Sequence, residues 1–348
     1  METDRIICKD WNNKIAEIKE NKTNFFKLKK IWFIITFIIL FSFLILSFIF
    51  IKNKISKKNL KENINIAIVL GNLTKLIQNI INPDESVCIF VKNKLKNRTQ
   101  PFDFENELFF FADLISCKIP FSFIRFGDGE NSIMKGDVHD TKIDKWYWNP
   151  KNKKFQDRLI ESASICMHHN NFIGIPCKNW NKISESILSY SKCSSAKYMS
   201  YATLFINKNF LLFKIWILSF INTTNRWKII LVANSIIHKS ITWAYKFFPV
   251  PDHLIENWDK YSISLLSELS HQAKENDLIF FISAGPAANI IISYLSKINN
   301  NNTYIDFGSS IEFITKGYTT RSYAINGETS FWSCEPFFLK NKLLIYTR

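Results

Sequence analysis

The sequence predicts an α/β domain with a mostly parallel sheet and flanking helices, preceded by one transmembrane helix. Three features predict this architecture: a long uncharged apolar run near the N-terminus, several brief apolar segments after it, and longer amphipathic segments between some of these. The chain has 348 residues, which is enough for a membrane anchor and a single domain of ordinary size. Its composition is 47% hydrophobic, so gross disorder is excluded.

The N-terminal apolar run covers residues 31–51 and contains no charged side chain. A helix of this length reaches about 30 Å, the thickness of a hydrocarbon core. We expect a retained membrane span rather than a cleaved signal peptide, because the run is longer than a usual signal-peptide core and no small-residue cleavage site follows it. The predicted order is a tail (residues 1–30), the span (31–51), a stem with a pre-domain helix (52–100) and the domain (101–348).

The membrane orientation of the chain stays open, because lysines flank the apolar run on both sides and the positive-inside rule gives a tie. One interpretation is an endomembrane protein of the ER or Golgi with a lumenal domain. Sequons for N-glycosylation suit this interpretation, although a chain this rich in Asn, Ser and Thr produces some by chance. These sequons begin at Asn72, Asn97, Asn222 and Asn301.

The seven cysteines and six histidines show no metal-binding spacing. There is no Cys-x-x-Cys pair, and we interpret His168, His169 and His253 as structural or exposed. Cys166 and Cys177 flank an apolar segment and are placed to pair in an oxidising lumen, whereas buried thiols are the commoner outcome for scattered cysteines. The redox compartment therefore stays open.

The charge of the chain is strongly basic, with 45 Lys and Arg against 30 Asp and Glu and a formal net charge of +15. Such an excess favours anionic lipid headgroups, phosphorylated substrates or nucleic acid as partners. The lysines are spread along the chain, however, and the sequence contains no recognisable nucleic-acid-binding module. We therefore expect no nucleic-acid partner.

Five brief segments in the second part of the chain are rich in Ile, Val and Phe, as buried strands of a parallel sheet are. They are residues 121–126, 172–176, 227–233, 277–283 and 303–308. Segments of helical length and pattern separate some of them. Because open α/β sheets bind ligands at the carboxyl ends of their strands, the residues that follow these segments are the candidate functional residues.

The most informative segment is FSFIRFGDGENSIMKG, residues 121–136. If the Asp-Gly-Glu triplet is extended, the side chains of Asp128 and Glu130 project to the same side and both reach one divalent cation. Gly129 between them leaves room for a diphosphate. The alternative is an ordinary Gly-Asp-Gly turn with a solvated Glu130. Arg125 adjoins the pair and either balances phosphate charge or forms a salt bridge to Asp128.

The second segment is DLIFFISAGPAANIIISYL, residues 277–295. A strand ends at Ser283-Ala284-Gly285, Pro286 fits the first position of a helix, and an apolar helix follows. The N–H groups at such a helix start would face the carboxyl edge of the sheet and form a phosphate cradle. The alternative is an ordinary turn between strand and helix.

The third segment is TYIDFGSSIEFITKGYTTR, residues 303–321. Asp306 and Gly308 close a strand, and Asp306 is a candidate for holding a ribose or sugar hydroxyl. A cation among Lys316 and Arg321 would balance a departing diphosphate. Solvated charges are the alternative for Lys316 and Glu312.

Three strings together carry a resemblance to a known family: RFGDGE at 125–130, AGPAA at 284–288 and IDFG at 305–308. In order and spacing they resemble the GT-D-type glycosyltransferases, once catalogued as a domain of unknown function, over roughly residues 102–321. The resemblance implies a Rossmann-like domain that transfers a sugar from a nucleotide donor, with a UDP-sugar expected and the acceptor unknown. Bacterial relatives tend to carry a His where this chain has Ser309 and Ser310, and they usually lack the anchor.

The resemblance also implies an Asp-x-Glu motif that holds Mn²⁺ or Mg²⁺. In this chain the metal ligands are then Asp128 and Glu130, and the catalytic residues are Asp128, Glu130 and Arg125. The expected contacts to the nucleotide sugar are Gly127, Gly129, Ser283, Gly285, Pro286, Asp306, Gly308 and Arg321. The sequence identifies no catalytic base and does not separate retention from inversion.

Two other classes of function remain as alternatives. One is a catalytically silent, membrane-tethered binding protein of the same fold. The other is a different enzyme with acidic residues at a sheet edge, either a phosphatase or a methyltransferase. A haloacid-type phosphatase needs a second Asp and a Thr after its nucleophile, where this chain has Asp128-Gly129-Glu130-Asn131-Ser132, and a dinucleotide-type GxGxxG is absent.

Overall fold

The structure is a computed structural model that describes residues 83–141, 146–167, 170–177, 181–193, 195–222, 227–234, 241–251, 253–319 and 321. The expected tail, the membrane span and the first part of the stem lie outside these residues, as do His168 and His169. Within the described part of the chain, no helix is both long and apolar enough to cross a membrane.

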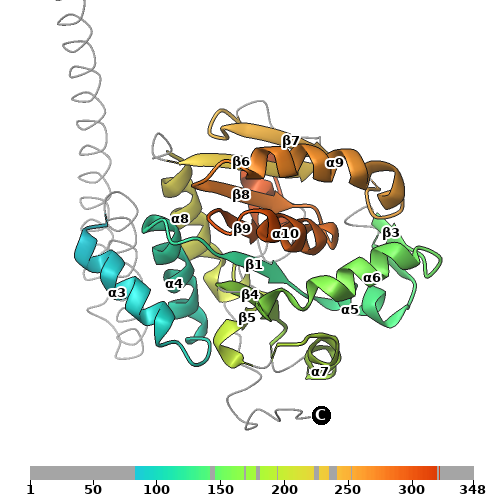
Figure 1. Cartoon of the computed structure of the whole chain (residues 1–348), viewed down its shortest axis with the longest axis horizontal. Coiled ribbons are helices and arrows are strands. Elements are labelled where there is room, and N and C mark those ends of the chain that lie inside the picture. Colours follow the sequence, from blue (N-terminus) through green and yellow to red (C-terminus); the bar gives the residue numbers. More distant parts are fainter. Residues whose placement is uncertain are drawn as a thin grey trace, which may run out of the picture. The chain divides into compact units, whose positions relative to one another are not determined.

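The centre of the domain is a seven-stranded sheet in the order β5-β4-β1-β9-β8-β6-β7, and every neighbouring pair is parallel (Figure 1). The strands are β1 (Ser122–Arg125), β4 (Asn171–Ile175), β5 (Met199–Tyr201), β6 (Lys228–Asn234), β7 (Lys246–Val250), β8 (Leu278–Ser283) and β9 (Thr303–Asp306). A separate antiparallel pair is formed by β2 (His139–Thr141) and β3 (Trp146–Trp148). The predicted α/β class is confirmed, and all five predicted strands are present.

Helices cover both faces of the sheet. They are α3 (Glu85–Lys96), α4 (Phe104–Ser116), α5 (Asp128–Lys135), α6 (Lys153–Ser162), α7 (Asn181–Tyr190), α8 (Phe210–Asn222), α9 (Trp258–Ala273), α10 (Ala287–Ile298) and the short α11 (Glu312–Thr315). One face packs against α4 and α8, whereas the opposite face packs against α10, beside which α6 and α9 lie. The sheet is thus the middle layer of three.

Alternation along the strands fills both interfaces. Phe123 of β1 points to one face, where its ring centre lies 4.9 Å from that of Phe111 in α4. The next residue, Ile124, points to the other face and joins the apolar cluster that includes Ile291 of α10. Burial of one such side chain stabilises the fold by about 1.5–3 kcal/mol, so packing on both faces holds the sheet between the layers.

Only the last part of the predicted stem and pre-domain helix is described, from Pro83 to Gln100. There α3 packs against α4, and a disulfide joins Cys88 of α3 to Cys117 at the end of α4. Just after α3, the guanidinium of Arg98 forms two hydrogen bonds of 2.8 and 2.7 Å with the carboxylate of Glu107, and both side chains are fully buried. In the described residues this segment is therefore part of the folded domain.

Candidate functional site

The Asp-Gly-Glu triplet is the first turn of α5 and is not extended, so the condition under which alternation would place both side chains on the same side is not met. β1 ends at Arg125, Gly127 is the N-cap residue, and the helix begins at Asp128. The physical reason is the capping bond: Glu130, the third helical residue, accepts the N–H of Gly127 at 2.8 Å. Acidic residues in a first turn also interact favourably with the helix dipole.

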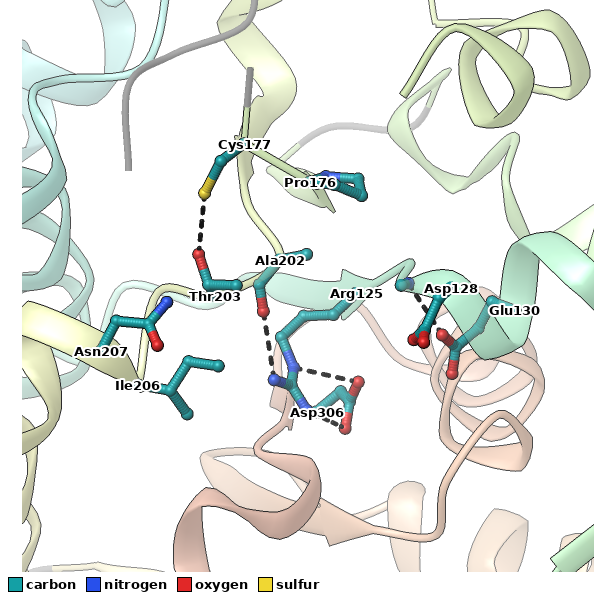
Figure 2. A pocket seen from close by; sticks show the side chains of 11 residues that line it. Arg125, Asp128, Glu130, Pro176, Cys177, Ala202, Thr203, Ile206, Asn207 and Asp306 are labelled. Carbon is teal, nitrogen blue, oxygen red and sulfur yellow. Dashed lines mark hydrogen bonds and ion pairs between the residues drawn. The ribbon is translucent and has the colours of Figure 1, made fainter. Parts of the chain in front are cut away.

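This capping bond brings the two carboxylates to the same end of α5. Two residues apart on a helix, the Asp128 and Glu130 side chains leave the axis on different sides. Because Glu130 folds back to the N–H of Gly127, its carboxylate returns to the helix start, and Figure 2 shows both carboxylates near the end of β1. The structure therefore keeps the predicted pair together for a different reason.

The two carboxyl groups differ in their surroundings. Asp128 is exposed and has no ion pair among the described residues, whereas Glu130 is half-buried. The loss of water around Glu130 raises the pKa of its carboxyl group to about 7. Its bond from Gly127 and the charge of Arg125 oppose the shift, while the negative charge of Asp306 adds to it. Of the two carboxyl groups, that of Glu130 is therefore the one whose ionised form is poorly solvated.

Arg125 pairs with Asp306, and the salt bridge to Asp128, one of the two alternatives for Arg125, is not formed. Nε and Nη2 of Arg125 donate to the two carboxylate oxygens of Asp306 at 3.2 and 3.3 Å, and Nη1 donates to the carbonyl of Ala202 at 3.2 Å. Burial raises the pKa of the Asp306 carboxyl group, and Arg125 opposes this shift. Asp306 therefore positions the guanidinium group of Arg125 beside the carboxylates of Asp128 and Glu130.

Gly308 and Ser283 form a chain of hydrogen bonds that ends at the carboxylate of Asp306. The N–H of Gly308 donates to Asp306 at 2.9 Å, and the hydroxyl of Ser283 at the end of β8 donates to the carbonyl of Gly308 at 2.8 Å. Gly308 has a left-handed φ of +50°, and a Cβ added there would collide with the guanidinium of Arg125. The structure thus gives Gly308 and Ser283 a role in placing Arg125.

Two of the predicted glycines face a tryptophan. A Cβ on Gly129 would lie 3.1 Å from the indole of Trp146, so an aromatic ring, and not a diphosphate, fills the space that Gly129 leaves. Trp146 is stacked on His139 with ring centres 4.8 Å apart. The same indole is also the nearest neighbour of Gly285, whose φ of +55° is the feature that favours glycine.

A cavity of about 300 Å³ opens beside the carboxylates, at the carboxyl ends of β1, β4, β5 and β9 (Figure 2). Its lining residues are Arg125, Gly127, Asp128, Glu130, Pro176, Cys177, Ala202, Thr203, Ile206, Asn207 and Asp306. The volume lies at the lower end of the range for small-molecule sites, which is about 300–1,000 Å³. Five of the predicted site residues therefore meet in one cavity.

The remaining predicted residues lie elsewhere. Ser283, Gly285, Pro286, Gly308 and Arg321 are not among the lining residues, nor is Gly129. Pro286 is the N-cap residue of α10 and so lies one position before the first helical position predicted for it. The start of α10 lies close to Trp146, through Gly285, rather than on this cavity.

The other charged candidates have protein partners. Lys316 pairs with Glu312 at 2.9 Å on α11, and His253 is exposed and lies 3.0 Å from Glu256. The interpretation of His253 as an exposed residue is confirmed, whereas the proposed part of Lys316 in balancing a diphosphate is not supported by its position.

Six lining residues were not among the predicted site residues: Pro176, Cys177, Ala202, Thr203, Ile206 and Asn207. Pro176 and Cys177 come directly after β4, which the sequence does predict, so the end of that strand was a usable signal. Ala202 to Asn207 follow β5, a strand of only three residues that the apolar pattern does not reveal. Asn289 of α10 was also missed; its amide donates to the carbonyl of Arg125 at 2.8 Å.

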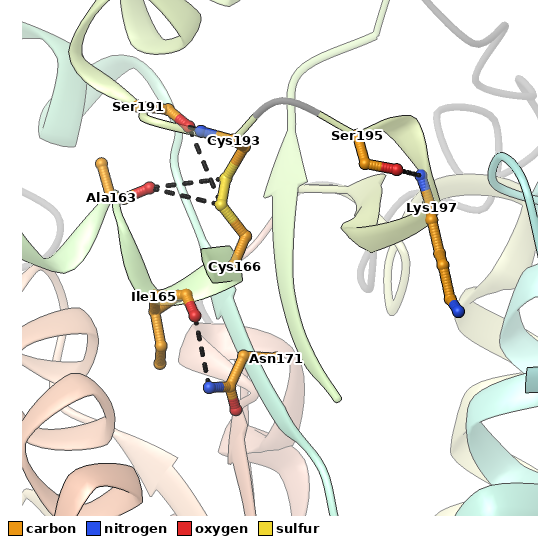
Figure 3. The surroundings of a disulfide bond; sticks show 8 residues. All are labelled: Ala163, Ile165, Cys166, Asn171, Ser191, Cys193, Ser195 and Lys197. Carbon is orange, nitrogen blue, oxygen red and sulfur yellow. Dashed lines mark hydrogen bonds between the residues drawn. A yellow bond between two sulfur atoms is a disulfide. The ribbon is translucent and has the colours of Figure 1, made fainter. Parts of the chain in front are cut away.

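Cysteine pairing at Cys166 differs from both alternatives that the sequence left open, a bond to Cys177 and a buried thiol. Cys166 forms a disulfide with Cys193, not with Cys177, and Figure 3 shows this bond beside the carbonyl of Ala163. The Cα atoms of Cys166 and Cys193 lie 5.7 Å apart, within the usual range for a disulfide. Together with Cys88–Cys117, at 5.3 Å, it gives two disulfides in the described part of the chain.

Comparison with known proteins gives neighbours of similar structure only. No protein-family model and no curated protein matches the sequence. Two solved structures of the domain of unknown function 1792, one described as a distinct glycosyltransferase fold, are 17% identical, with a TM-score of 0.43 over 65% of this chain and 84% of theirs. A third, described as a new glycosyltransferase from Streptococcus sanguinis, is 14% identical, with a TM-score of 0.43 over 62% and 84%.

Proposed function

We propose that this chain is a glycosyltransferase that transfers a sugar from a nucleoside-diphosphate sugar, with a divalent cation held by Asp128 and Glu130. The observation that carries the proposal is the placement of both carboxylates at one end of α5, in a cavity at the carboxyl edge of a parallel sheet. The resemblance of RFGDGE to the GT-D-type Asp-x-Glu motif supports the same assignment. A UDP-sugar is the expected donor, and the acceptor is a glycan, protein or lipid.

The donor atoms at this site suit Mn²⁺ or Mg²⁺. These hard cations bind through one or two carboxylates and complete their coordination with water and substrate phosphates. Asp128 is exposed and has no competing ion pair in the described residues. The described residues contain no cluster of three or more His, Cys, Asp or Glu that could hold a metal, so the proposed site has two protein carboxylates and no third ligand of these types. When bound, such a cation neutralises the charge that develops on the diphosphate leaving group.

Arg125 supplies a second positive charge from the protein itself. Its guanidinium is fixed by Asp306 and by the carbonyl of Ala202, and both terminal nitrogens carry a second N–H that these bonds do not use. We propose that these N–H groups bind a phosphate oxygen of the donor, since a preorganised arginine binds such oxygens without first losing side-chain entropy.

We also propose that residues 31–51 anchor the chain in a membrane and that the domain lies in an oxidising compartment, such as the lumen of the ER or Golgi. The two disulfides support the location, because disulfides persist in secretory compartments and are rare in the cytosol. A lumenal domain also defines the membrane orientation of the chain, which the lysines on either side of residues 31–51 leave open. Protease treatment of sealed membrane vesicles tests it: a protected domain agrees, and digestion of the domain from outside contradicts the orientation.

The function is tested with a panel of nucleotide sugars and the purified full-length chain, by measuring donor hydrolysis as the Mn²⁺ concentration is raised. Slow hydrolysis of a donor needs no knowledge of the acceptor. We expect one donor class to be hydrolysed, and Asp128→Asn and Glu130→Gln to reduce hydrolysis by at least about 100-fold because they remove the charge that a hard cation requires.

The matched control is Asp137→Asn, which removes an exposed carboxylate just beyond α5. It is expected to leave hydrolysis unchanged, and melting temperatures of all three variants report on folding. Activity that persists in a chelator, or in either site variant, contradicts the metal-carboxylate assignment. Nucleotide-sugar binding with no turnover for any donor favours a catalytically silent binding protein.

A further inference from the structure

The cavity has a second end, opposite the carboxylates. Figure 2 shows Cys177, Thr203, Ile206 and Asn207 on one side of the Arg125–Asp306 pair, with Asp128 and Glu130 on the other. These residues follow β4 and β5, and none of them has a part in holding a cation or a phosphate in the function proposed above. In the proposed function, this end of the cavity is left for a part of the donor other than the diphosphate.

Asn207 is the unsatisfied polar group at this end. Its residue surface is only 4% exposed, and its Nδ2 atom is buried without a hydrogen-bond partner among the described residues. A buried amide left without a hydrogen-bond partner destabilises the folded chain, because it has lost its bonds to water. The nearby Asn209 shows the contrast, because its Nδ2 donates to the carbonyls of Phe104 and Leu204 at 2.6 and 3.0 Å.

The backbone of Asn207 is also in an uncommon conformation. Its φ is +56°, in the left-handed region, at the start of the short 3-10 helix η5 (Asn207–Asn209). Asn tolerates this region better than most residues, but the conformation is still unfavourable and persists where the surrounding structure enforces it. Asn170 also combines a left-handed φ with a buried polar atom that lacks a partner, but Asn207 does so in the wall of the cavity, where a ligand can supply the missing partner.

The surroundings narrow the chemistry of the ligand. An unpartnered N–H donor requires an acceptor on the ligand, such as a ring carbonyl or a ring nitrogen. The neighbouring lining residues Pro176 and Ile206 are apolar, and Thr203 Oγ1 already lies 3.3 Å from the sulfur of Cys177. A sugar carries hydroxyl groups around its ring and needs several polar partners, whereas a planar heterocycle needs polar partners only along its edge.

We propose that Asn207 binds the nucleobase of the donor, with its Nδ2 donating to a carbonyl or imino acceptor on the base edge. The inference rests on the proposed function, since it places the diphosphate at Asp128 and Glu130 and extends the nucleoside across the Arg125–Asp306 pair. Asn207 is then the residue that selects the base. A site built to hydrogen-bond one group discriminates strongly against an analogue that lacks it.

The test uses variants that suit the left-handed backbone. Asn207→Gly removes the amide and relieves the strain at φ +56°, so its fold is expected to be retained, and Asn207→Asp keeps the shape but replaces the donor by an acceptor. The matched control is Asn170→Gly, because Asn170 has nearly the same φ, +58°, and lies at the amino end of β4, away from the cavity.

The probes are UDP, CDP, GDP and ADP, each with Mn²⁺, and inorganic diphosphate as a probe without a base. Dissociation constants are measured by calorimetry on the purified full-length chain. We expect the wild type to prefer one base, Asn207→Gly and Asn207→Asp to weaken the preferred nucleotide by about 10- to 100-fold, and both to bind inorganic diphosphate as the wild type does. Asn170→Gly is expected to change neither affinity.

Three outcomes overturn the inference. If Asn207→Gly keeps both the affinity and the base preference while Mn²⁺-dependent nucleotide binding persists, the inference is wrong and the proposed function stands. If inorganic diphosphate is weakened as much as the nucleotide, Asn207 does not act on the base. If the folded wild type binds no nucleoside diphosphate, the inference and the proposed function both fail.

Discussion

Arg125 at the end of β1 and Asp306 at the end of β9 form a two-point ion pair between neighbouring strands, with N–O distances of 3.2 and 3.3 Å. This choice of partner determines the electrostatics of the cavity. Because Arg125 is bound to Asp306, Asp128 keeps no cation of its own among the described residues. The pair therefore separates a fixed positive charge from a carboxylate that is available to a metal ion.

The first prediction concerns this pair. Asp306→Asn should lower the free energy of unfolding by about 2–4 kcal/mol, because it leaves a largely buried guanidinium without its counter-charge. The double variant Arg125→Met/Asp306→Asn should recover part of the loss, since no buried charge then remains unpaired. Chemical denaturation measures both. Asp157→Asn breaks an exposed pair with Lys153 and should cost less than about 1 kcal/mol; equal losses for Asp306 and Asp157 would contradict the prediction.

A second prediction separates backbone strain from crowding at Gly308. Gly308→Ala should lower stability by at least about 2 kcal/mol, because it adds strain at φ +50° and also displaces the guanidinium of Arg125. Gly136 is the matched control, since its φ is +86° and its nearest neighbour lies at an ordinary 3.4 Å. Gly136→Ala should cost about 1 kcal/mol. Thermal melts of both variants give the comparison. If Gly308→Ala loses less stability than Gly136→Ala, the collision with Arg125 is excluded.

The strands that the sequence predicts are those buried on both faces. β6 and β8 contain continuous apolar runs, which are typical of central parallel strands, and β1 is buried at three of its four residues. β5 and β7 are the two outer strands and were missed: β5 has three residues, and β7 contains Pro249 and is partly exposed. Edge strands carry a weak apolar signal, so the residues after β5, Asn207 among them, could not be predicted.

The site residues were predicted by position along the chain, and their partners were not. A strand end places Asp128, Glu130 and Asp306 at one edge of the sheet, which follows from parallel topology alone. The capping bond of Glu130, the choice of Asp306 by Arg125 and the pairing of Cys166 with Cys193 depend on distances across the fold. Sequence separation does not determine such distances.

The third prediction concerns the two disulfides. Replacement of Cys88 and Cys117 by Ala should lower stability by about 2–4 kcal/mol, since the bond closes a loop over a sequence separation of 29, and the Cys166/Cys193 pair, with a separation of 27, should behave alike. Addition of a reductant should lower the melting temperature of the wild type by more than that of a variant without these four cysteines, which keeps only the disulfide of Cys177. Mass spectrometry of the unreduced protein identifies the pairs. A Cys166–Cys177 linkage would contradict the structure.

A fourth prediction places the start of the folded domain. A fragment that begins at Pro83 should fold, whereas one that begins at Pro101 should be less stable by at least about 3–5 kcal/mol. It lacks Arg98, which leaves the buried Glu107 unpaired, and it lacks Cys88, the disulfide partner of Cys117. Glu107→Gln in the shorter fragment should recover part of this loss. Circular dichroism during chemical denaturation gives the stabilities. If the two fragments are equally stable, residues 83–100 contribute nothing to the domain.

The last prediction concerns the pH dependence of the cluster at the start of α5. Burial raises the pKa of Glu130 to about 7, above the ordinary value near 4.5 that it has in the unfolded chain. Between these two values the folded state binds more protons than the unfolded state, so its stability falls as pH rises. Without metal, the protein should lose about 1–3 kcal/mol from pH 4.5 to pH 7 through this group, and nothing more above about pH 7.

A cation that binds the ionised form of Glu130 should reverse this trend. Mn²⁺ affinity should rise with pH up to about 7, by about tenfold per pH unit at most, and level off above it, because a proton must leave before the carboxylate binds the metal. Glu130→Gln should abolish this rise and stabilise the metal-free protein at pH 8, since the amide oxygen still accepts the N–H of Gly127. Melting temperatures with and without Mn²⁺ from pH 4.5 to pH 8 measure both effects. If Glu130→Gln and the wild type show the same pH dependence without metal, Glu130 is not the group that titrates. If Mn²⁺ stabilises both proteins equally at pH 8, Glu130 does not bind the cation.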